Sequence, residues 1–534
     1  MLKYLLLIGT VMVIGILLNK VVARIPVPSL LIFIALGMLF GENGPIGIPF
    51  DNYSCAEVIC AVGLILIMFY GGFGTNITSA RDVVVKSGLL ASLGVCLTAL
   101  MTMVFCHYVL KLSWLEGFLI GSVISSTDAA SVFHILRSQN LSLKYNTDSL
   151  LEVESGSNDP ASFMLTVIAC ALLSGEDIAL SVLLFKQVVF GVVTGLVFGR
   201  VAVYMLNHFA FGEEHEKTVL VLAIALLSYG ISTALGGNGY LSSYLCGIYM
   251  GNRRMAHKRY LVHFFDALTS IAQLLIFFVL GLLVTPVDLP KVILPSAGIM
   301  IFMTFLGRPL VVWLILKPFR ATKEQIAVVS FAGLRGVASI CFAIYAMLFP
   351  FEQTYNLYNL VMGVVLLSLS FQGTLLPFVC RKCAMIDAAE DVRKTFNDYQ
   401  EVSDVNFTRI HIGQSHTFQG KKIKDIMAFE DLLVALIVRD NTTLIPNGET
   451  VIRTDDVLVL AGREFAEQEN IILREKEITR RHIWNGKTLG ELRLPKETLI
   501  VMVQKPCSDV IPTGDTVIEA GDVLVMAETG RPAY

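Results

Sequence analysis

Charged residues are scarce in this sequence. They make up 16% of its 534 residues, whereas hydrophobic residues make up 54% and the mean hydropathy is +0.68. Soluble domains usually carry about 25% charged residues. The scarcity is confined to residues 1–380, which hold 40 charged side chains, while the shorter stretch 381–534 holds 45. The composition argues against a soluble enzyme and predicts a lipid-embedded part followed by a water-exposed domain.

Several motifs that would indicate other functions are absent. No G-x-S-x-G motif surrounds the serines, which argues against a membrane hydrolase, and no carbonyl filter of the TVGYG kind occurs. Cys380 and Cys383 form a single CxxC motif without a second pair at zinc-ribbon spacing, so a metal site is not predicted. No G-x-G-x-x-G motif follows a strand in residues 381–534, so no cofactor is expected there. The net charge of −3 does not indicate nucleic-acid binding.

Long hydrophobic runs fill residues 1–380. A spanning helix needs roughly 20 mostly apolar residues, and dividing this part at its polar, Gly and Pro positions yields about thirteen candidates. The ninth is too short to cross alone, which leaves the count open by one. The candidates are 4–23, 28–48, 56–76, 85–110, 115–137, 148–174, 183–206, 217–236, 239–251, 262–285, 292–316, 323–348 and 356–379. The sequence predicts a polytopic α-helical membrane protein of about 13 transmembrane helices.

The basic residues of the loops indicate the orientation, because positively charged loops stay in the cytoplasm. If the C-terminus is inside, the cytoplasmic loops hold 15 Lys and Arg residues and the opposite side holds 3. One wrongly inserted span would remove this bias. We therefore predict a multi-pass membrane protein with the N-terminus outside and the tail in the cytoplasm.

Three ionisable residues remain deep inside apolar spans: Asp128 on the fifth, Asp159 on the sixth and Arg335 on the twelfth. At 1.5 Å per residue, Asp128 lies roughly 14 Å from Arg137 and Asp159 roughly 16 Å from Asp148, so the two carboxylates share one depth. Arg335 reaches the same region, where one cation can meet two anions. A central charge costs at least about 2.5–3.5 kcal/mol, so each of the three requires compensation.

Polar side chains surround both carboxylates, in the stretches 125–128 and 154–160. Pro160 lacks an N–H group and its ring disfavours a hydrogen bond to the carbonyl of Gly156, so we expect backbone oxygen near Gly156 to be free as a ligand. Secondary transporters coordinate small cations at mid-membrane with broken helices, carboxylates and hydroxyls. Hard oxygen ligands suit an alkali cation, and no His or Cys cluster suggests a transition metal.

Two interpretations of these charges remain open. They can simply pair and hold helices together, and for Arg335 and Glu154 this is as good an explanation as a role in transport. For Asp128 and Asp159 an exchange site is favoured, because like charges at one depth raise each other's proton affinity. A site with shifted affinity can exchange a proton for a cation, which is the chemistry of an antiporter.

The motifs around these residues resemble those of one family. The stretch ESGSNDPAS beginning at Glu154, the Thr127-Asp128 pair and the GLRG run 333–336 are similar to the ESGxNDP, TD and GLRG motifs of NhaP-type exchangers in the monovalent cation/proton antiporter-1 family. Gly71-Gly72 and the run 307–309 resemble two further signatures. The resemblance covers most of residues 1–380. It implies inverted repeats of six spans around the seventh, and a mobile core bundle working against a dimer domain in a homodimer.

The resemblance also implies the roles of individual residues. Asp159 would be the principal carboxylate, loaded by a proton or a cation. Asp128, Thr127 and Ser155 would complete the ion shell. Asn158 replaces the acid of electrogenic relatives, which implies electroneutral exchange.

Two further implications concern the residues around the ion shell. Glu154 and Arg335 would form a structural charge pair, and Arg308 would support the same bundle. Some relatives place an acid on the third span, whereas here residues 69–75 contain none.

The tail contains an internal duplication. Residues 446–460 recur as residues 512–526, with nine of fifteen positions identical. Each copy predicts a short helix, an apolar strand, a turn and a second strand. The expected organisation is a transmembrane domain, a linker, a first small α+β module, a helical connector and a second such module. Their expected bounds are 1–380, 381–403, 404–462, 463–469 and 470–534, with helical structure around 464–474.

These modules resemble TrkA C-terminal (RCK-C) domains, which implies regulation by a small ligand such as cyclic di-AMP. An assembly module without a ligand is the alternative. The leading prediction is an electroneutral antiporter that exchanges K⁺, or Na⁺, for H⁺ and has a regulatory tail. A Na⁺/H⁺ antiporter with a purely structural tail, a tail-gated cation channel and a non-transporting membrane sensor are the alternatives.

Overall fold

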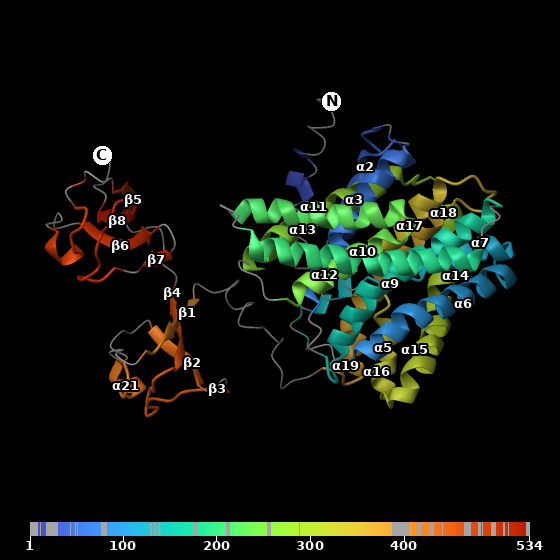
Figure 1. Ribbon diagram of the computed structural model, residues 1–534. Helices are drawn as coiled ribbons and strands as arrows, with labels where there is room; N and C mark the ends of the chain where they lie inside the picture. The colour runs from blue at the N-terminus through green and yellow to red at the C-terminus, as the bar shows by residue number, and fades with distance from the viewer. Residues whose placement is uncertain are drawn as a thin grey trace. The chain divides into compact units, whose positions relative to one another are not determined.

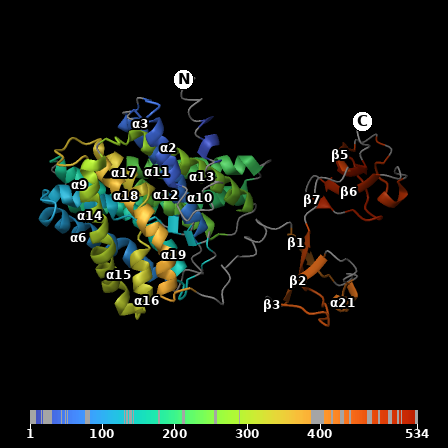
Figure 2. The ribbon, with the colours of Figure 1, turned by 180° about the vertical axis from the view of Figure 1, so that it is seen from behind.

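The architecture is described from a computed structural model, drawn from two opposite sides in Figures 1 and 2. The chain divides into two compact units, residues 1–393 and 394–534, each described by itself. The structure describes residues 9–10, 12–15, 17, 30–42, 44–48, 50, 52–75, 83–128, 131–132, 135–136, 139, 141, 143–175, 179–209, 214–253, 258–287, 289–386, 405–413, 418–426, 432–439, 442–463, 471–478, 482, 484–492, 498–505, 508–510 and 512–529.

The first unit is built of helices. Their bounds are α2 (Leu30–Phe40), α3 (Tyr53–Gly74), α5 (Val84–Leu89), α6 (Val95–Tyr108), α7 (Trp114–Ile124), α9 (Thr147–Leu173), α10 (Leu180–His208), α11 (Glu214–Ala234), α12 (Gly239–Gly251), α13 (Lys258–Leu283), α14 (Leu289–Phe302), α15 (Arg308–Leu316), α16 (Lys323–Phe331), α17 (Val337–Met347), α18 (Leu357–Leu367) and α19 (Gly373–Lys382). Side-chain caps begin some of them: Ser113 accepts the N–H of Glu116 before α7, and Thr322 accepts that of Gln325 before α16.

Seven helical stretches among the described residues are long and apolar enough to cross a membrane. They are Tyr53–Gly74, Val84–Tyr108, Leu180–His208, His215–Ala234, Tyr260–Leu283, Leu289–Phe319 and Leu357–Lys382. Shorter apolar helices occur at Leu31–Phe40, Trp114–Ile124 and Val337–Met347. The first candidate span, 4–23, lies mostly outside the described residues.

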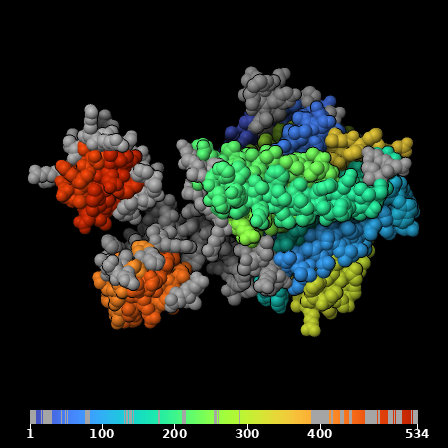
Figure 3. All heavy atoms as spheres, in the orientation of Figure 1, coloured from blue at the N-terminus to red at the C-terminus, as the bar shows by residue number. Residues whose placement is uncertain are grey.

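The surface of α10 fits a lipid environment. This helix lies along one face of the first unit, where Figure 3 shows it in teal beside the green α11. Its exposed side chains include Phe185, Val193 and Tyr204. Apolar side chains are stable on the outside of a helix when the surrounding solvent is hydrocarbon.

Glycines allow close packing inside the unit. Gly247 of α12 lies against the backbone of Phe69 in α3, where a Cβ atom would collide with a carbonyl oxygen. Small residues at such contacts let membrane helices approach closely and gain van der Waals packing.

The same series of irregular helices occurs twice. A π-helical turn at 90–94 joins α5 to α6, and α7 then ends at Ile124 before the non-helical residues 125–128. A second π-helical turn at 303–307 joins α14 to α15, and α16 then ends at Phe331, before α17 begins at Val337. The broken spans are therefore the fifth and the twelfth of the predicted set.

Helix α9 runs through Pro160 without interruption. Proline removes one N–H and the bond to the carbonyl of residue 156, and the remaining turns of a long helix tolerate this loss in a packed membrane bundle. The side-chain amide of Asn238 also donates a hydrogen bond to the Pro160 carbonyl at 2.7 Å. The sixth span is therefore one continuous helix, and the free backbone oxygen expected near Gly156 stays a prediction.

The second unit contains two four-stranded antiparallel sheets with the same strand order. The first is β1-β4-β2-β3 and the second β5-β8-β6-β7. The strands are β1 (Val405–His411), β2 (Leu432–Arg439), β3 (Thr442–Leu444), β4 (Val457–Arg463), β5 (Ile471–Glu477), β6 (Thr498–Lys505), β7 (Ser508–Val510) and β8 (Val523–Thr529). A one-turn helix α21 (Ile423–Ile426) in the first copy corresponds to a 3₁₀ turn (Leu489–Glu491) in the second.

The duplication of the sequence is also a duplication of the packing. The core of the first sheet includes Ile437, Ile452 and Leu458, and the core of the second includes Val503, Ile518 and Leu524, each 66 positions later. A register shift between Val434 and Leu436 recurs between Ile500 and Met502.

One expectation for the tail is wrong, and another concerns residues that the structure does not describe. Residues 471–474, expected to be helical, begin strand β5, because pairing with β8 satisfies their backbone groups. The connector 463–469, except Arg463, and most of the linker 381–403 lie outside the described residues.

Candidate ion-exchange site

The non-helical segments of the two broken spans are hydrogen-bonded to each other. The backbone N–H of Asp128 donates to the carbonyl of Leu334 at 2.8 Å. In return, the guanidinium of Arg335 donates to the carbonyls of Ser125 and Ser126 at 2.8 and 2.7 Å. Each non-helical segment therefore satisfies backbone groups of the other, which is the condition for irregular backbone inside a membrane protein.

The charged side chains of Arg335 and Asp128 lie at the ends of helical segments and offset the partial charges of those ends. A helix C-terminus carries partial negative charge and an N-terminus partial positive charge. The Arg335 guanidinium donates to the carbonyls of Ser125 and Ser126, which directly follow the last residue of α7. Asp128 accepts the N–H of Ser131 at 3.3 Å and its hydroxyl at 2.5 Å, as an N-capping aspartate does. The midplane charges are thus partly neutralised by backbone dipoles.

Two glycines of the GLRG run make room for charged side chains. A Cβ atom at Gly333 would collide with the Arg308 guanidinium, and one at Gly336 would collide with the Asp128 carboxylate. Gly336 begins the approach to α17 in extended conformation. The glycines of this motif are therefore required by the space that Arg308 and Asp128 occupy.

Asp128 and Asp159 line one cavity of about 220 Å³. Thr127 and Ser155 also line it, so the structure brings together four of the five predicted ion-site residues. Asp159 is 7% exposed, and its carboxylate accepts a hydrogen bond from the Ser126 hydroxyl. Among the residues that the structure describes, no Lys or Arg forms an ion pair with Asp159.

The fifth predicted residue, Asn158, does not line the cavity. Its amide donates to the Thr127 hydroxyl at 2.5 Å, and its buried carbonyl oxygen has no hydrogen-bond partner among the described residues. The Ser155 hydroxyl donates to the Thr127 carbonyl, also at 2.5 Å. Asn158 therefore fixes the orientation of Thr127, and Ser155 ties α9 to the broken fifth span.

The buried ion pair differs from the expected one. Arg308 donates to both carboxylate oxygens of Glu154 at 2.8 and 3.1 Å, whereas the hydrogen bonds of the Arg335 guanidinium go to backbone carbonyls. The expected Glu154–Arg335 pair is therefore wrong. The expected meeting of Arg335 with Asp128 and Asp159 is also not what its hydrogen bonds show. The absence of a side chain at Gly333 leaves room for the Arg308 guanidinium, which reaches the Glu154 carboxylate.

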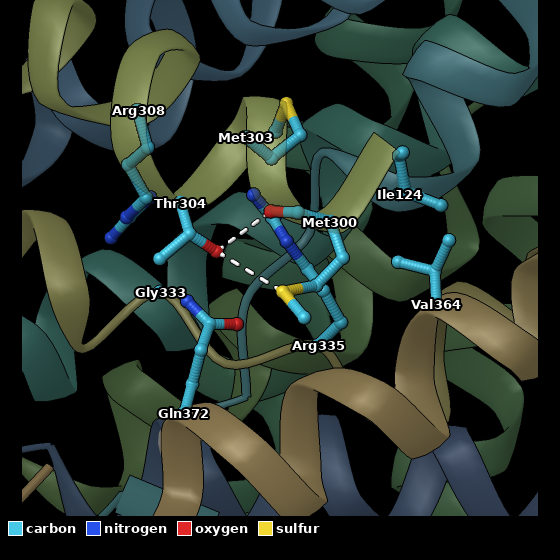
Figure 4. A pocket seen from close by; sticks show the side chains of 9 residues that line it. All are labelled: Ile124, Met300, Met303, Thr304, Arg308, Gly333, Arg335, Val364 and Gln372. Atoms are coloured by element: carbon cyan, nitrogen blue, oxygen red, sulfur yellow. Dashed lines mark hydrogen bonds between the residues drawn. The ribbon is translucent and has the colours of Figure 1, made fainter. Parts of the chain in front are cut away.

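The two arginines line a second, very small cavity of about 10 Å³, shown in Figure 4. Thr304 and Gln372 also line it, and the Thr304 hydroxyl donates to the Met300 carbonyl. A volume of this size holds about one water molecule. The arginines therefore face a space separate from the cavity of the carboxylates.

Three polar residues that face the large cavity or its carboxylate were not among the predicted ion-site residues, although Ser126 belongs to the polar stretch 125–128. Glu152 and Gln273 line the cavity, and Ser126 donates to Asp159. Glu152 precedes Asp159 by seven residues, which places both on one face of a helix. That spacing was a signal available in the sequence, whereas Gln273 lies on α13 and is brought near by packing alone.

Comparison with known proteins agrees with this geometry. Residues 8–382 match the family model described as "Sodium/hydrogen exchanger, transmembrane", and residues 408–464 and 474–528 each match the TrkA-C domain. A K(+)/H(+) antiporter NhaP2 of Shewanella sp. strain ANA-3 is 35% identical over 469 residues, covering 86% of this chain and 81% of the relative. A K(+)/H(+) antiporter NhaP of Alkalimonas amylolytica is 35% identical over 371 residues, covering 69% and 64%.

A solved structure shares the fold. The sodium proton antiporter MjNhaP1 of Methanocaldococcus jannaschii superimposes with a TM-score of 0.64 at 22% identity, covering 72% of this chain and 99% of that one. The family match spans more than half of the chain and contains both broken helices and the carboxylate cavity. This chain therefore belongs to the sodium/hydrogen exchanger family and carries two TrkA-C domains in its tail.

Proposed function

We propose that this protein is a secondary antiporter that exchanges K⁺, or Na⁺, for H⁺ across the plasma membrane of a prokaryote. One observation carries the proposal: Asp159 is buried beside Asp128 in a cavity lined with oxygen ligands, without a described basic side chain to neutralise it. A buried carboxylate requires a proton or a cation for neutrality. Competition of the two for one carboxylate couples their movements.

The exchange follows from the cost of moving charge. With the site open to one side, Asp159 releases its proton and binds a cation through its carboxylate, with Asp128 and the oxygens of Thr127 and Ser155 completing the shell. Only the neutralised site crosses the apolar barrier, because an empty charged site costs several kcal/mol to move. Asn158 is neutral and faces Thr127, which supports a one-for-one, electroneutral exchange.

K⁺ is the favoured cation for two reasons. The relatives that cover most of this chain are named K(+)/H(+) antiporters, and TrkA-C domains match the tail. A Na⁺/H⁺ antiporter with a structural tail is the second candidate, favoured by the fold that this chain shares with MjNhaP1.

The deciding experiment is exchange in proteoliposomes loaded with a pH-sensitive dye, with K⁺ and Na⁺ titrated in turn at several pH values. The expected result is proton movement driven by K⁺ at lower concentrations than by Na⁺, with the apparent cation affinity falling as the pH falls. Cation current without proton movement would favour a tail-gated channel, and an affinity independent of pH would contradict a shared site.

The proposed arrangement extends to the whole chain. We propose thirteen spans with inverted repeats in residues 1–380, in keeping with the two series of irregular helices, together with a homodimeric assembly and a cytoplasmic tail. The tail would regulate exchange through two modules, 404–462 and 470–534, in response to a small ligand such as cyclic di-AMP. Truncation after residue 393 is the test. Unchanged pH and ligand dependence in the truncated protein would contradict regulation.

A further inference from the structure

The walls of the carboxylate cavity are unequal in charge. Helix α3 contributes the apolar residues Leu64, Ile67 and Met68, together with Gly71. Helix α13 contributes Gln273 and Phe277. Besides Asp128 and Asp159, the one carboxylate among the described lining residues is Glu152 of α9.

Glu152 stands at the mouth of this cavity. It is exposed, whereas Asp159 is buried. Glu152, Ser155 and Asp159 are spaced i, i+3 and i+7, so they form one polar stripe along α9, with its ends roughly 10 Å apart at 1.5 Å per residue. Glu154 lies two residues after Glu152 and therefore on another face of the helix. There it binds Arg308. Two neighbouring glutamates therefore have different surroundings.

Beyond Asp159, helix α9 packs against other segments of the first unit. The Asn238 amide joins the start of α12 to the Pro160 carbonyl of α9. Beyond it, the ring of Phe163 packs against those of Tyr240, Phe342 and Tyr345, with centroids 4.8, 5.3 and 5.1 Å away. In this conformation, a cation approaching Asp159 along α9 comes from the side of Glu152.

We propose that Glu152 is an affinity-determining residue of the antiporter, which draws the cation into the cavity without binding it at the exchange site. This rests on the proposed function. A fixed negative charge in a cleft with apolar walls raises the local concentration of cations. Because this attraction depends on charge alone, Glu152 lowers the KM for K⁺ and for Na⁺ by the same factor and leaves kcat unchanged. Asp159 remains the group that exchanges the proton.

The test is Glu152→Gln in the full-length protein, reconstituted in liposomes, with K⁺ and Na⁺ as substrates. At roughly 10 Å and an effective dielectric constant between 80 and 20, loss of the charge raises KM by about 2- to 15-fold. Glu152→Asp keeps the charge and is expected to stay close to wild type. Asp148→Asn is the matched control, because Asp148 lies in the first turn of α9 and does not line the cavity.

The outcomes separate this proposal from the function on which it rests. A raised KM for both cations in Glu152→Gln supports the proposal, together with a KM that choline chloride raises more in wild type than in the variant, because the salt screens the Glu152 charge. A KM equal to that of Asp148→Asn overturns it, as does a loss of kcat, which would make Glu152 part of the exchange site. Absence of exchange in the wild-type protein would instead refute the proposed function.

Discussion

Ion pairs in the membrane unit and in the tail use the same types of side chain in different surroundings. In the membrane unit, the side chains of Arg308 and Glu154 are 8% and 2% exposed. In the tail, those of Lys424 and Glu449 are 51% and 63% exposed. Breaking a buried pair leaves an uncompensated charge, whereas exposed pairs contribute little because water and salt screen them. Burial, rather than the pair itself, therefore decides how much each charge matters.

Asp159 gives the sharpest contrast, since it is buried without a described basic partner. Asp159→Asn removes a charge that the fold does not use, so we expect exchange to fall to the background of empty liposomes while thermal unfolding in detergent stays near wild type. Proteoliposome exchange and a melting curve measure the two effects. Retained exchange would sink the assignment of Asp159.

Arg308→Met tests the buried pair. It leaves Glu154 buried without its partner, and we expect a loss of about 3–5 kcal/mol in stability, visible as reduced yield and a lower unfolding temperature. The double variant Arg308→Met with Glu154→Gln removes the stranded charge and should recover part of the loss. Equal losses in the single and double variants would contradict a stranded charge as the cause.

The ion pair of Arg439 and Asp456 in the tail is intermediate in burial between the Arg308–Glu154 pair and the Lys424–Glu449 pair. Arg439 donates two hydrogen bonds of 2.7 Å to the buried Asp456 carboxylate, whereas the equivalent Lys505 lies 3.7 Å from Asp522. Arg439→Lys converts the first module to the geometry of the second. We expect a loss of about 1–2 kcal/mol, measured as faster hydrogen exchange of β2 and β4 in the full-length protein. Lys505→Arg should slow exchange of β6 and β8, and no change in either variant would show that the fork geometry is unimportant.

The same carboxyl predicts an acid dependence of the first module. Burial favours the neutral acid, but hydrogen bonds from Arg439 and the Arg453 N–H outweigh it and hold the pKa of Asp456 below its ordinary value. The stabilisation is therefore complete above the unfolded pKa of about 3.9 and is lost as the pH falls through the lowered value. Peptic digestion across this range should cut β4 of Arg439→Lys at a higher pH than β4 of wild type. Identical cleavage profiles would count against the linkage.

Lys424→Ala is expected to have the smallest effect of these substitutions. Lys422 and Lys424 both bind Glu449 and hold the pKa of that carboxyl below its usual range, but all three side chains are exposed. We expect no measurable change in the hydrogen exchange of α21 or in transport. A clear destabilisation would mean that the exposed pair of Lys424 and Glu449 contributes more to stability than is expected for a pair screened by water and salt.

The sequence predicted the class of each region because composition and local spacing are sufficient for it. Long apolar runs predict spanning helices, and an offset of 66 residues predicts two copies of one module, which the two matching sheets confirm. The carboxylates Asp128 and Asp159 were identifiable because so few charges occur in the spans. Strands β1 and β5 were harder to predict, since their sequences are mixed and their pairing with β4 and β8 is non-local.

Only the tertiary structure decided which groups meet. The sequence placed Glu154, Arg308 and Arg335 in one bundle but did not determine their pairing, because a guanidinium can be satisfied equally by a carboxylate or by helix-end carbonyls. The structure also decided where the helices break, at 125–128 and 332–336, where two segments distant in sequence exchange hydrogen bonds. A break in a membrane helix is stable only where its backbone groups find partners, and those partners are set by the crossing of distant segments.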